Sequence, residues 1–297
     1  MGNTYEFAPR VERRGNLTEK LNSLILAASE NINTEAEKFY GLKGLVEKDG
    51  CLALSGYAKS NGGIYSEQRM ETFKQEISDS EAAHSMAFRA GRGTPEFNRI
   101  ISDWKERSKQ SKANKIEQAI MLLFYKFLKE EFIVVRSAVY DDYKAGVDNL
   151  IVNKRTGEVI CAIDDFHEGE HDRNKAEKTK RKAEKGGSTV HFGLGVKDGK
   201  IIRTKMENLP VFYLGISSES FEALMQSMGG DINSPLSPKE KEVFLEFVSS
   251  LQAQQQAMAE LTLKPKIQAN VLGLKPVLEN IRLIAESTNQ PKQAKAA

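Results

Sequence analysis

The sequence predicts an α/β protein in which helical regions flank a central mixed segment. Three observations predict this fold class: an amphipathic helix over about 114–130, three β-rich runs directly after it, and a charged helix over about 170–185 followed by further strands. A chain of 297 residues is long enough to bury a large core. We divide it into a helical N-terminal region (1–112), the α/β core (113–234) and a helical C-terminal region (235–297).

Apolar residues at helical spacing dominate the N-terminal region. The first set is Leu17, Leu21, Leu24, Ile25 and Ala28. A turn-rich stretch at 55–63 ends that unit, and helical patterns resume over 66–88 and 95–108. Trp104, the only tryptophan, lies among lysines and arginines, so it is either a partly buried anchor or a contact to nucleic acid.

The core combines one strong helix with strands. The β-rich runs are joined by turn residues and predict an antiparallel meander; they cover 132–140, 147–152 and 158–164. After the charged helix, Gly186 and Gly187 lead into the run 188–196, a KDGK turn and an apolar strand over 209–217.

The C-terminal region opens with a helix-start signature. Ser237, Pro238 and Glu240 have the spacing of an N-cap, a first-position proline and a capping-box glutamate. A last short helix over 275–287 precedes a tail that we expect to be disordered.

Composition excludes several classes of protein. Lys and Arg total 43 against 41 Asp and Glu, so the chain is not a polycation, although a local basic face stays open. Two cysteines, Cys51 and Cys161, exclude a disulfide scaffold. The sequence has neither an apolar run long enough to span a membrane nor the apolar core of a signal peptide at its start, so we expect a cytoplasmic protein without membrane contact.

Glu117 is a carboxylate on the apolar stripe of the helix over 114–130. On a helical wheel it falls between Phe124 and Leu128. A carboxylate on a core-facing stripe loses solvation unless a positive group meets it. Glu117 is therefore either a site residue or a residue at the edge of the stripe that reaches water. The opposite, solvent-facing side is predicted to carry Gln118, Tyr125 and Lys129.

Three aspartates lie where neighbouring strands begin and end. Asp148 opens the second run, and Asp164 and Asp165 end the third. Antiparallel neighbours bring the start of one strand beside the end of the other, so we expect Asp148 and Asp164 within a few ångström of each other. Carboxylates that close repel unless a cation holds them, and oxygen ligands of this kind favour Mg²⁺ or Mn²⁺. Taken singly, each aspartate could instead cap a turn or a strand end.

These residues resemble the motif of the PD-(D/E)XK nuclease superfamily, which includes restriction endonucleases and Holliday-junction resolvases. The similarity lies in Glu117, in Gly146-Val147-Asp148, in Asp164 and in the order of elements over 113–218. It implies a restriction endonuclease-like core and metal-dependent hydrolysis of DNA or RNA. Asp148 and Asp164 would be the metal ligands, and Glu117 would hold a metal-bound water or a second ion.

The lysine of this motif is missing from its usual place. Phe166 stands two residues after Asp164, where the superfamily has lysine. Some members carry the lysine on the following helix, and here Lys178 and Lys182 are our candidates, with Lys175 in addition. If none of them acts, the resemblance implies a nuclease-like fold that binds nucleic acid or scaffolds a complex without cutting.

The charged helix also predicts a surface for nucleic acid. Residues 172–185 hold seven Lys or Arg against three acids, and a second basic run lies between 105 and 115. Basic runs beside carboxylates suit a phosphate backbone, with DNA favoured over RNA, although such runs are often only solvated helix faces. The expected phosphate contacts are Lys175, Lys180, Arg181 and Lys185. A homodimer is also left open.

A rival motif overlaps this region. Residues 167–171 read H-E-x-x-H, which binds zinc when both histidines share one face of a helix. Gly169 and the charged flanks disfavour such a helix, so a zinc hydrolase is the third hypothesis. We prefer a loop, with His167 at the edge of the nuclease site.

Overall fold

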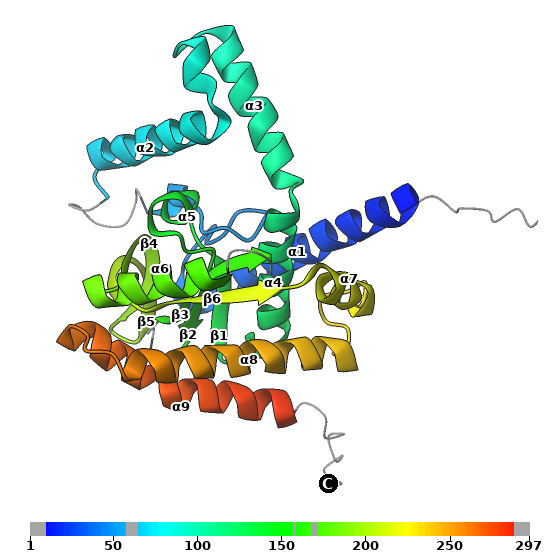
Figure 1. Ribbon diagram of the computed structural model, residues 1–297, viewed down its shortest axis with the longest axis vertical. Coiled ribbons are helices and arrows are strands. Elements are labelled where there is room, and N and C mark those ends of the chain that lie inside the picture. Colours follow the sequence, from blue (N-terminus) through cyan, green and yellow to red (C-terminus); the bar gives the residue numbers. More distant parts are fainter. Residues whose placement is uncertain (1–9, 58–64, 157–158, 168–171, 288–297) are drawn as a thin grey trace, which may run out of the picture.

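The computed structural model has the α/β architecture that the sequence predicts (Figure 1). It describes the backbone of residues 10–57, 65–156, 159–167 and 172–287. Within these ranges the side chains are described except at residues 10–16, 159–161, 165–167 and 172–176.

A four-stranded mixed sheet lies at the centre of the fold, in the order β1-β2-β3-β6. Strands β1 (Phe132–Arg136), β2 (Asn149–Asn153) and β3 (Val159–His167) form an antiparallel meander, which confirms that expectation. Strand β6 (Val211–Ile216) pairs with β3 in parallel. Helix α4 (Lys112–Leu128) packs against β1 and β3, whereas α6 (Asp172–Lys185) packs along β6. Along the chain, the order is therefore a helix, the antiparallel meander, a second helix and a parallel strand that completes the sheet.

A second, two-stranded sheet interrupts the crossover from α6 to β6. Strands β4 (Ser188–Lys197) and β5 (Lys200–Leu209) form a hairpin whose turn places Asp198 and Gly199 at positive φ. The sequence identified the turn but not β5. Most residues of β5 are half-exposed, and its polar residues conceal the β pattern.

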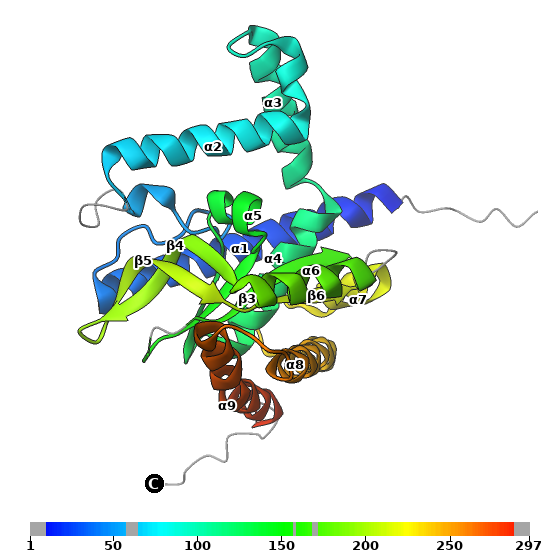
Figure 2. The same cartoon turned by 60° about the vertical axis from the view of Figure 1, so that its left-hand side comes forward.

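The N-terminal region contains a long helix and a separate helical arm. Helix α1 (Arg10–Tyr40) is longer than the expected apolar set and is followed by η1 (Leu54–Gly56). The arm, which consists of α2 (Glu67–Ser85), η2 (Ala87–Ala90) and α3 (Pro95–Lys109), stands away from the sheet in both views (Figures 1 and 2). It has its own small apolar cluster of Ala82, Ala87 and Phe97. The arm leads directly into α4.

Helix α4 is covered on nearly all sides, not on one stripe. Gln118 and Tyr125 were expected to face solvent, but both are buried, and Lys129 is half-buried. The expectation was wrong because α1 packs over that side of α4. The largest apolar cluster joins residues of all three regions of the chain.

Two boundaries near the predicted site differ from expectation. Strand β1 ends at Arg136, and the segment expected to be strand end and turn forms helix α5 (Val139–Ala145). The buried Asp141 carboxylate fixes this helix to β4, because it accepts the backbone N–H groups of His191 (2.7 Å) and Phe192 (2.8 Å). Strand β3 does not end at Asp164 but continues to His167, because parallel pairing with β6 extends it.

The C-terminal region forms helices that lie on the side of the sheet away from the arm (Figures 1 and 2). They are α8 (Pro238–Ala259) and α9 (Pro265–Ser287), and α7 (Ser218–Ser227) precedes them at the end of the core region and packs against α8. The capping box of Ser237 and Glu240 is confirmed at the start of α8. Glu240 is fully buried and also forms an ion pair with Lys126 of α4. None of the helices in the described ranges combines the length and apolar character that crossing a membrane requires.

Candidate functional site

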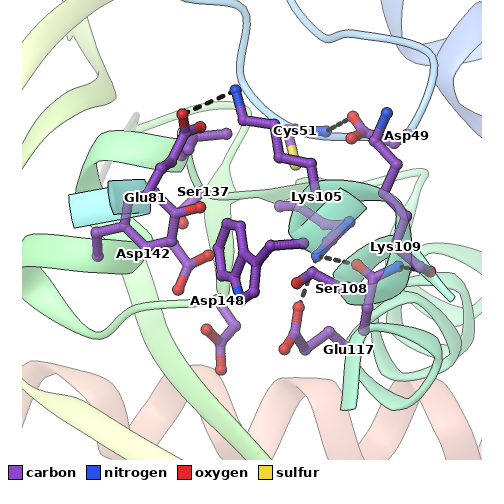
Figure 3. A pocket seen from close by; sticks show the side chains of 15 residues that line it. Asp49, Cys51, Glu81, Lys105, Ser108, Lys109, Glu117, Ser137, Asp142 and Asp148 are labelled. Atoms are coloured by element: carbon purple, nitrogen blue, oxygen red, sulfur yellow. Dashed lines mark hydrogen bonds and ion pairs between the residues drawn. The ribbon is translucent and has the colours of Figure 1, made fainter. Parts of the chain in front are cut away.

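One cleft lies where the arm meets the sheet and has a volume of about 290 Å³ (Figure 3). Its wall is formed by helices α2, α3, α4 and α5, the loop between α1 and η1, the end of β1 and the residue before β2. Its lining residues are Asp49, Cys51, Glu81, Trp104, Lys105, Ser108, Lys109, Asn114, Glu117, Arg136, Ser137, Val139, Asp142, Tyr143 and Asp148. Two of the predicted site residues, Glu117 and Asp148, are among them.

Asp148 is fixed between two strands by its backbone. Its N–H donates to the carbonyl oxygen of Ile163 at 2.7 Å, and its carbonyl oxygen accepts the N–H of Ser137 at 2.8 Å. Asn149 pairs with Ile163 across the sheet, so Asp148 lies beside the residue before Asp164. The sequence therefore placed Asp148 and Asp164 correctly as neighbours on adjacent strands.

Asp164 is a buried carboxylate just behind the cleft. It lies within β3, and only 8% of the residue is exposed. Its negative charge acts on Asp142 of α5. Asp164 thus belongs electrostatically to the carboxylates of the cleft, although it does not line the cleft itself.

Asp142 is the site residue that sequence reasoning missed. The pKa of this carboxyl is raised to about 7 in total. Burial is the largest cause, the charges of Glu117 and Asp164 contribute to the rise, and the charge of Arg136 opposes it. The residue was missed because its segment was interpreted as a turn. The available signal was the apolar residues Val139 and Tyr140 before two adjacent aspartates, which suit a short helix beside a polar cleft.

The structure supplies Glu117 with the positive group that its place on an apolar stripe requires. Glu117 Oε2 accepts a hydrogen bond from the guanidinium of Arg136 at 2.6 Å. The side chains of Arg136 and Glu117 are only 9% and 19% exposed. Arg136 also donates to Asn114 Oδ1 at 2.9 Å, and its backbone pairs with Gly50 and Leu52. Glu117 is therefore a cleft residue held in a largely buried ion pair.

The opposite wall of the cleft is aromatic and basic. His84 stacks on the indole of Trp104, with ring centroids 5.9 Å apart and planes 13° apart, and Tyr143 lies 6.5 Å from the same indole. Lys105 and Lys109 line this wall as well, and Lys105 pairs with Glu81 at 2.8 Å. The cleft thus combines acidic side chains with aromatic and basic side chains that can bind bases and phosphates.

The candidate lysines of α6 divide into two kinds. The Lys182 ammonium donates to the carbonyl oxygens of Ala145 (2.6 Å) and Gly146 (3.4 Å), at the C-terminus of α5. Lys182 therefore supports the turn that leads into Asp148. Lys178, one helical turn earlier on the same face, has an exposed side chain.

The other basic candidates of α6 are exposed where they are described. This holds for Lys180, Arg181 and Lys185, and Arg181 pairs with Glu177 at 3.1 Å. Lys175 belongs to α6 and Asp165 to β3, but both side chains lie outside the described residues.

The first histidine of the H-E-x-x-H segment, His167, lies in a strand and not in a helix. His167 is the last residue of strand β3, and residues 168–171 lie outside the described part of the chain. Two histidines four residues apart bind one zinc ion only from a common helix face. The side chain of His167 is likewise outside the description.

The chain matches no known protein in these comparisons, and its described side chains include no group of metal ligands. Comparison of the chain with protein-family models, curated proteins and solved structures gave no match. Among the described side chains, no three or more His, Cys, Asp or Glu residues are grouped so that they could hold a metal ion.

The Arg136–Glu117 pair predicts a clear stability effect. Glu117→Leu should lower the free energy of unfolding by roughly 3 kcal/mol, because it leaves a largely buried guanidinium without its carboxylate. Urea denaturation measures the change. The double variant Glu117→Leu/Arg136→Met removes both charges and should recover most of the loss. A single variant as stable as the wild type would show that the pair does not stabilise the fold.

The raised pKa of Asp142 predicts that stability falls as the pH rises. The folded-state pKa of about 7 exceeds the ordinary value of 3.8, so the folded protein binds more protons between pH 4 and 7. The melting temperature should therefore decrease from pH 5 to pH 8. Asp142→Asn should remove this part of the pH dependence and raise the melting temperature at pH 8. An unchanged pH profile in Asp142→Asn, with Asp198→Asn as the control, would contradict the assignment.

Proposed function

We propose that this protein is a metal-dependent phosphodiester hydrolase that acts on nucleic acid. The observation that carries the proposal is the set of carboxylates at the cleft: Glu117, Asp142 and Asp148 line it, and Asp164 lies behind it. Burial is the main cause that raises the pKa of Asp142 to about 7, and repulsion by Glu117 and Asp164 contributes to the rise. A bound divalent cation would relieve that repulsion, which is a functional reason to keep the charges together.

The order of elements supports the same proposal. A helix, an antiparallel meander, a second helix and a parallel strand follow one another through α4, β1, β2, β3, α6 and β6. This is the order of the restriction endonuclease-like core implied by the resemblance to PD-(D/E)XK nucleases. In this interpretation the β4–β5 hairpin and the α2–α3 arm are additions to that core.

The donor set fits Mg²⁺ or Mn²⁺, because every candidate ligand is a carboxylate oxygen. Asp148 and Asp164 would hold the ion together with water molecules, because no three described carboxylates are grouped as ligands, and Asp142 would face the ion without binding it directly. Glu117 has one oxygen held by Arg136, so it would contribute at most the other. A bound Mg²⁺ would neutralise charge on the scissile phosphate and lower the pKa of a water molecule.

The residues of the chain would then divide the remaining work. Lys178 is the candidate to orient the attacking water and to stabilise negative charge that develops at phosphorus. Lys182 would act as a positioning residue, because its ammonium supports the carbonyl groups of Ala145 and Gly146 just before Asp148. The exposed face of α6 would contact phosphates through Lys180, Arg181 and Lys185, with Lys175 in addition.

A non-catalytic nucleic-acid-binding protein is the second candidate function. It is favoured by Phe166 in the place of the motif lysine. Cleavage by the wild type decides between the two. DNA is the first substrate to test, in branched, single-stranded and double-stranded form, with Mg²⁺ and with Mn²⁺.

Removal of a metal ligand should abolish cleavage without unfolding the protein. Asp148→Asn and Asp164→Asn each delete one ligand and ease carboxylate repulsion, so their melting temperatures should equal or exceed that of the wild type. Mg²⁺ should raise the wild-type melting temperature at pH 8, and both variants should lose this shift. Asp198→Asn, in the exposed β4–β5 turn, is the matched control. Wild-type cleavage rates in both variants would refute the metal assignment.

The lysines of α6 should separate catalysis from binding. Lys178→Ala should lower single-turnover cleavage by a factor of about 100 while affinity changes little, because its charge acts in the transition state. Lys180→Ala, an exposed neighbour on the same helix, should instead weaken binding and reduce its salt dependence by about one ion. Lys182→Ala should lower both the melting temperature and the cleavage rate. If Lys178→Ala only weakens binding, Lys178 is not catalytic.

A further inference from the structure

The aromatic wall of the cleft has no role in the proposed hydrolysis. Trp104 is half-exposed, and it belongs neither to the main apolar cluster nor to the small cluster of the arm. A large ring outside both clusters contributes little to packing, yet it lines the same cleft as Asp148. Its position therefore calls for a ligand.

The indole is held in place from the protein side. His84 of α2 stacks on it nearly in parallel, and Tyr143 of α5 lies against both rings, 5.4 Å from His84 and 6.5 Å from Trp104. Three elements thus orient one aromatic surface at the cleft. A ring whose orientation is fixed in this way loses little freedom when a flat group stacks on it.

The size and charge of the cleft define what that flat group is. A volume of about 290 Å³ is at the lower end for a small-molecule site, which is the scale of a single nucleotide unit. Lys109, on the same helix as Trp104, supplies positive charge for a phosphate, whereas the ammonium of Lys105 is paired with Glu81. Aromatic rings beside basic side chains are the usual means of binding single strands without base specificity.

We propose that the cleft binds an unpaired nucleotide of a single strand, whose base stacks on Trp104 while its phosphate lies between Lys109 and the carboxylates. The substrate of the site would accordingly be single-stranded nucleic acid or the unpaired part of a branched or frayed structure. The inference rests on the proposed function for the class of substrate, and it adds which form of that substrate enters the cleft.

Because Trp104 is the only tryptophan, its fluorescence reports directly on this wall. A short oligothymidylate and the same oligomer annealed to oligoadenylate are titrated into the full-length protein in Ca²⁺. The single strand should quench the emission, and the duplex should not. Fluorescence anisotropy of a labelled oligothymidylate should show that Trp104→Ala weakens binding by about 10-fold, which corresponds to the loss of one base stack. Trp104→Phe should restore most of the affinity.

Phe88→Ala is the matched control, because Phe88 is an exposed aromatic residue of the arm that does not line the cleft. Equal quenching by duplex and single strand, or undiminished single-strand affinity in Trp104→Ala when the protein melts as the wild type does, would overturn the inference. Stacking without cleavage in any metal would leave the inference intact and refute the proposed hydrolysis. If the wild type and Trp104→Ala cleave duplex equally well, the proposed hydrolysis is supported and the single-strand inference is refuted.

Discussion

One buried guanidinium, that of Arg136, makes the acidic cleft compatible with a folded protein. It binds Glu117 directly, and its charge opposes the rise in the pKa of Asp142. Its backbone also joins the end of β1 to residues 50 and 52, so the same residue ties the sheet to the loop on the cleft wall. Carboxylates gathered on a partly buried surface repel one another, and a fixed cation of the chain compensates for part of that repulsion.

The cleft depends on a contact between two parts of the chain that differ in packing. The carboxylates come from α4, α5 and the sheet, which belong to the large apolar cluster. The aromatic and basic wall comes mainly from the arm, whose α2 residues Met70 and Phe73 join the large apolar cluster while Ala82, Ala87 and Phe97 form a small cluster of their own. The arm meets the rest through a few contacts, including the hydrogen bond of Tyr140 to Glu76 and the packing of Phe73 on Tyr140. The cleft is thus lined on one side by the large core and on the other by an arm that is anchored to it through α2.

Much of the fold could be predicted from local pattern, whereas the site could be predicted only in part. The period of apolar residues located α4, and turn residues located the meander, because both signals are local. Strand β5 and helix α5 were not predicted, since tertiary contacts determine them: β5 pairs with β4, and Asp141 fixes α5 to β4. Asp148 and Asp164 were correctly placed as neighbours by strand logic. The ion-pair partner of Glu117 could not be predicted, because Arg136 lies on another element and nothing in its local sequence marks it as buried.

The parallel pairing of β3 with β6 has a consequence for how the chain folds during synthesis. Strand β6 follows β3 only after α6 and the whole β4–β5 hairpin, and Lys20 of α1 donates to the carbonyl of Met225, 205 residues later. Contacts so distant in sequence form slowly, because a long loop must close before they stabilise anything. At ribosomal rates of 5–20 residues per second, this hydrogen bond between α1 and α7 can form only roughly 10–40 s after Lys20 is synthesised.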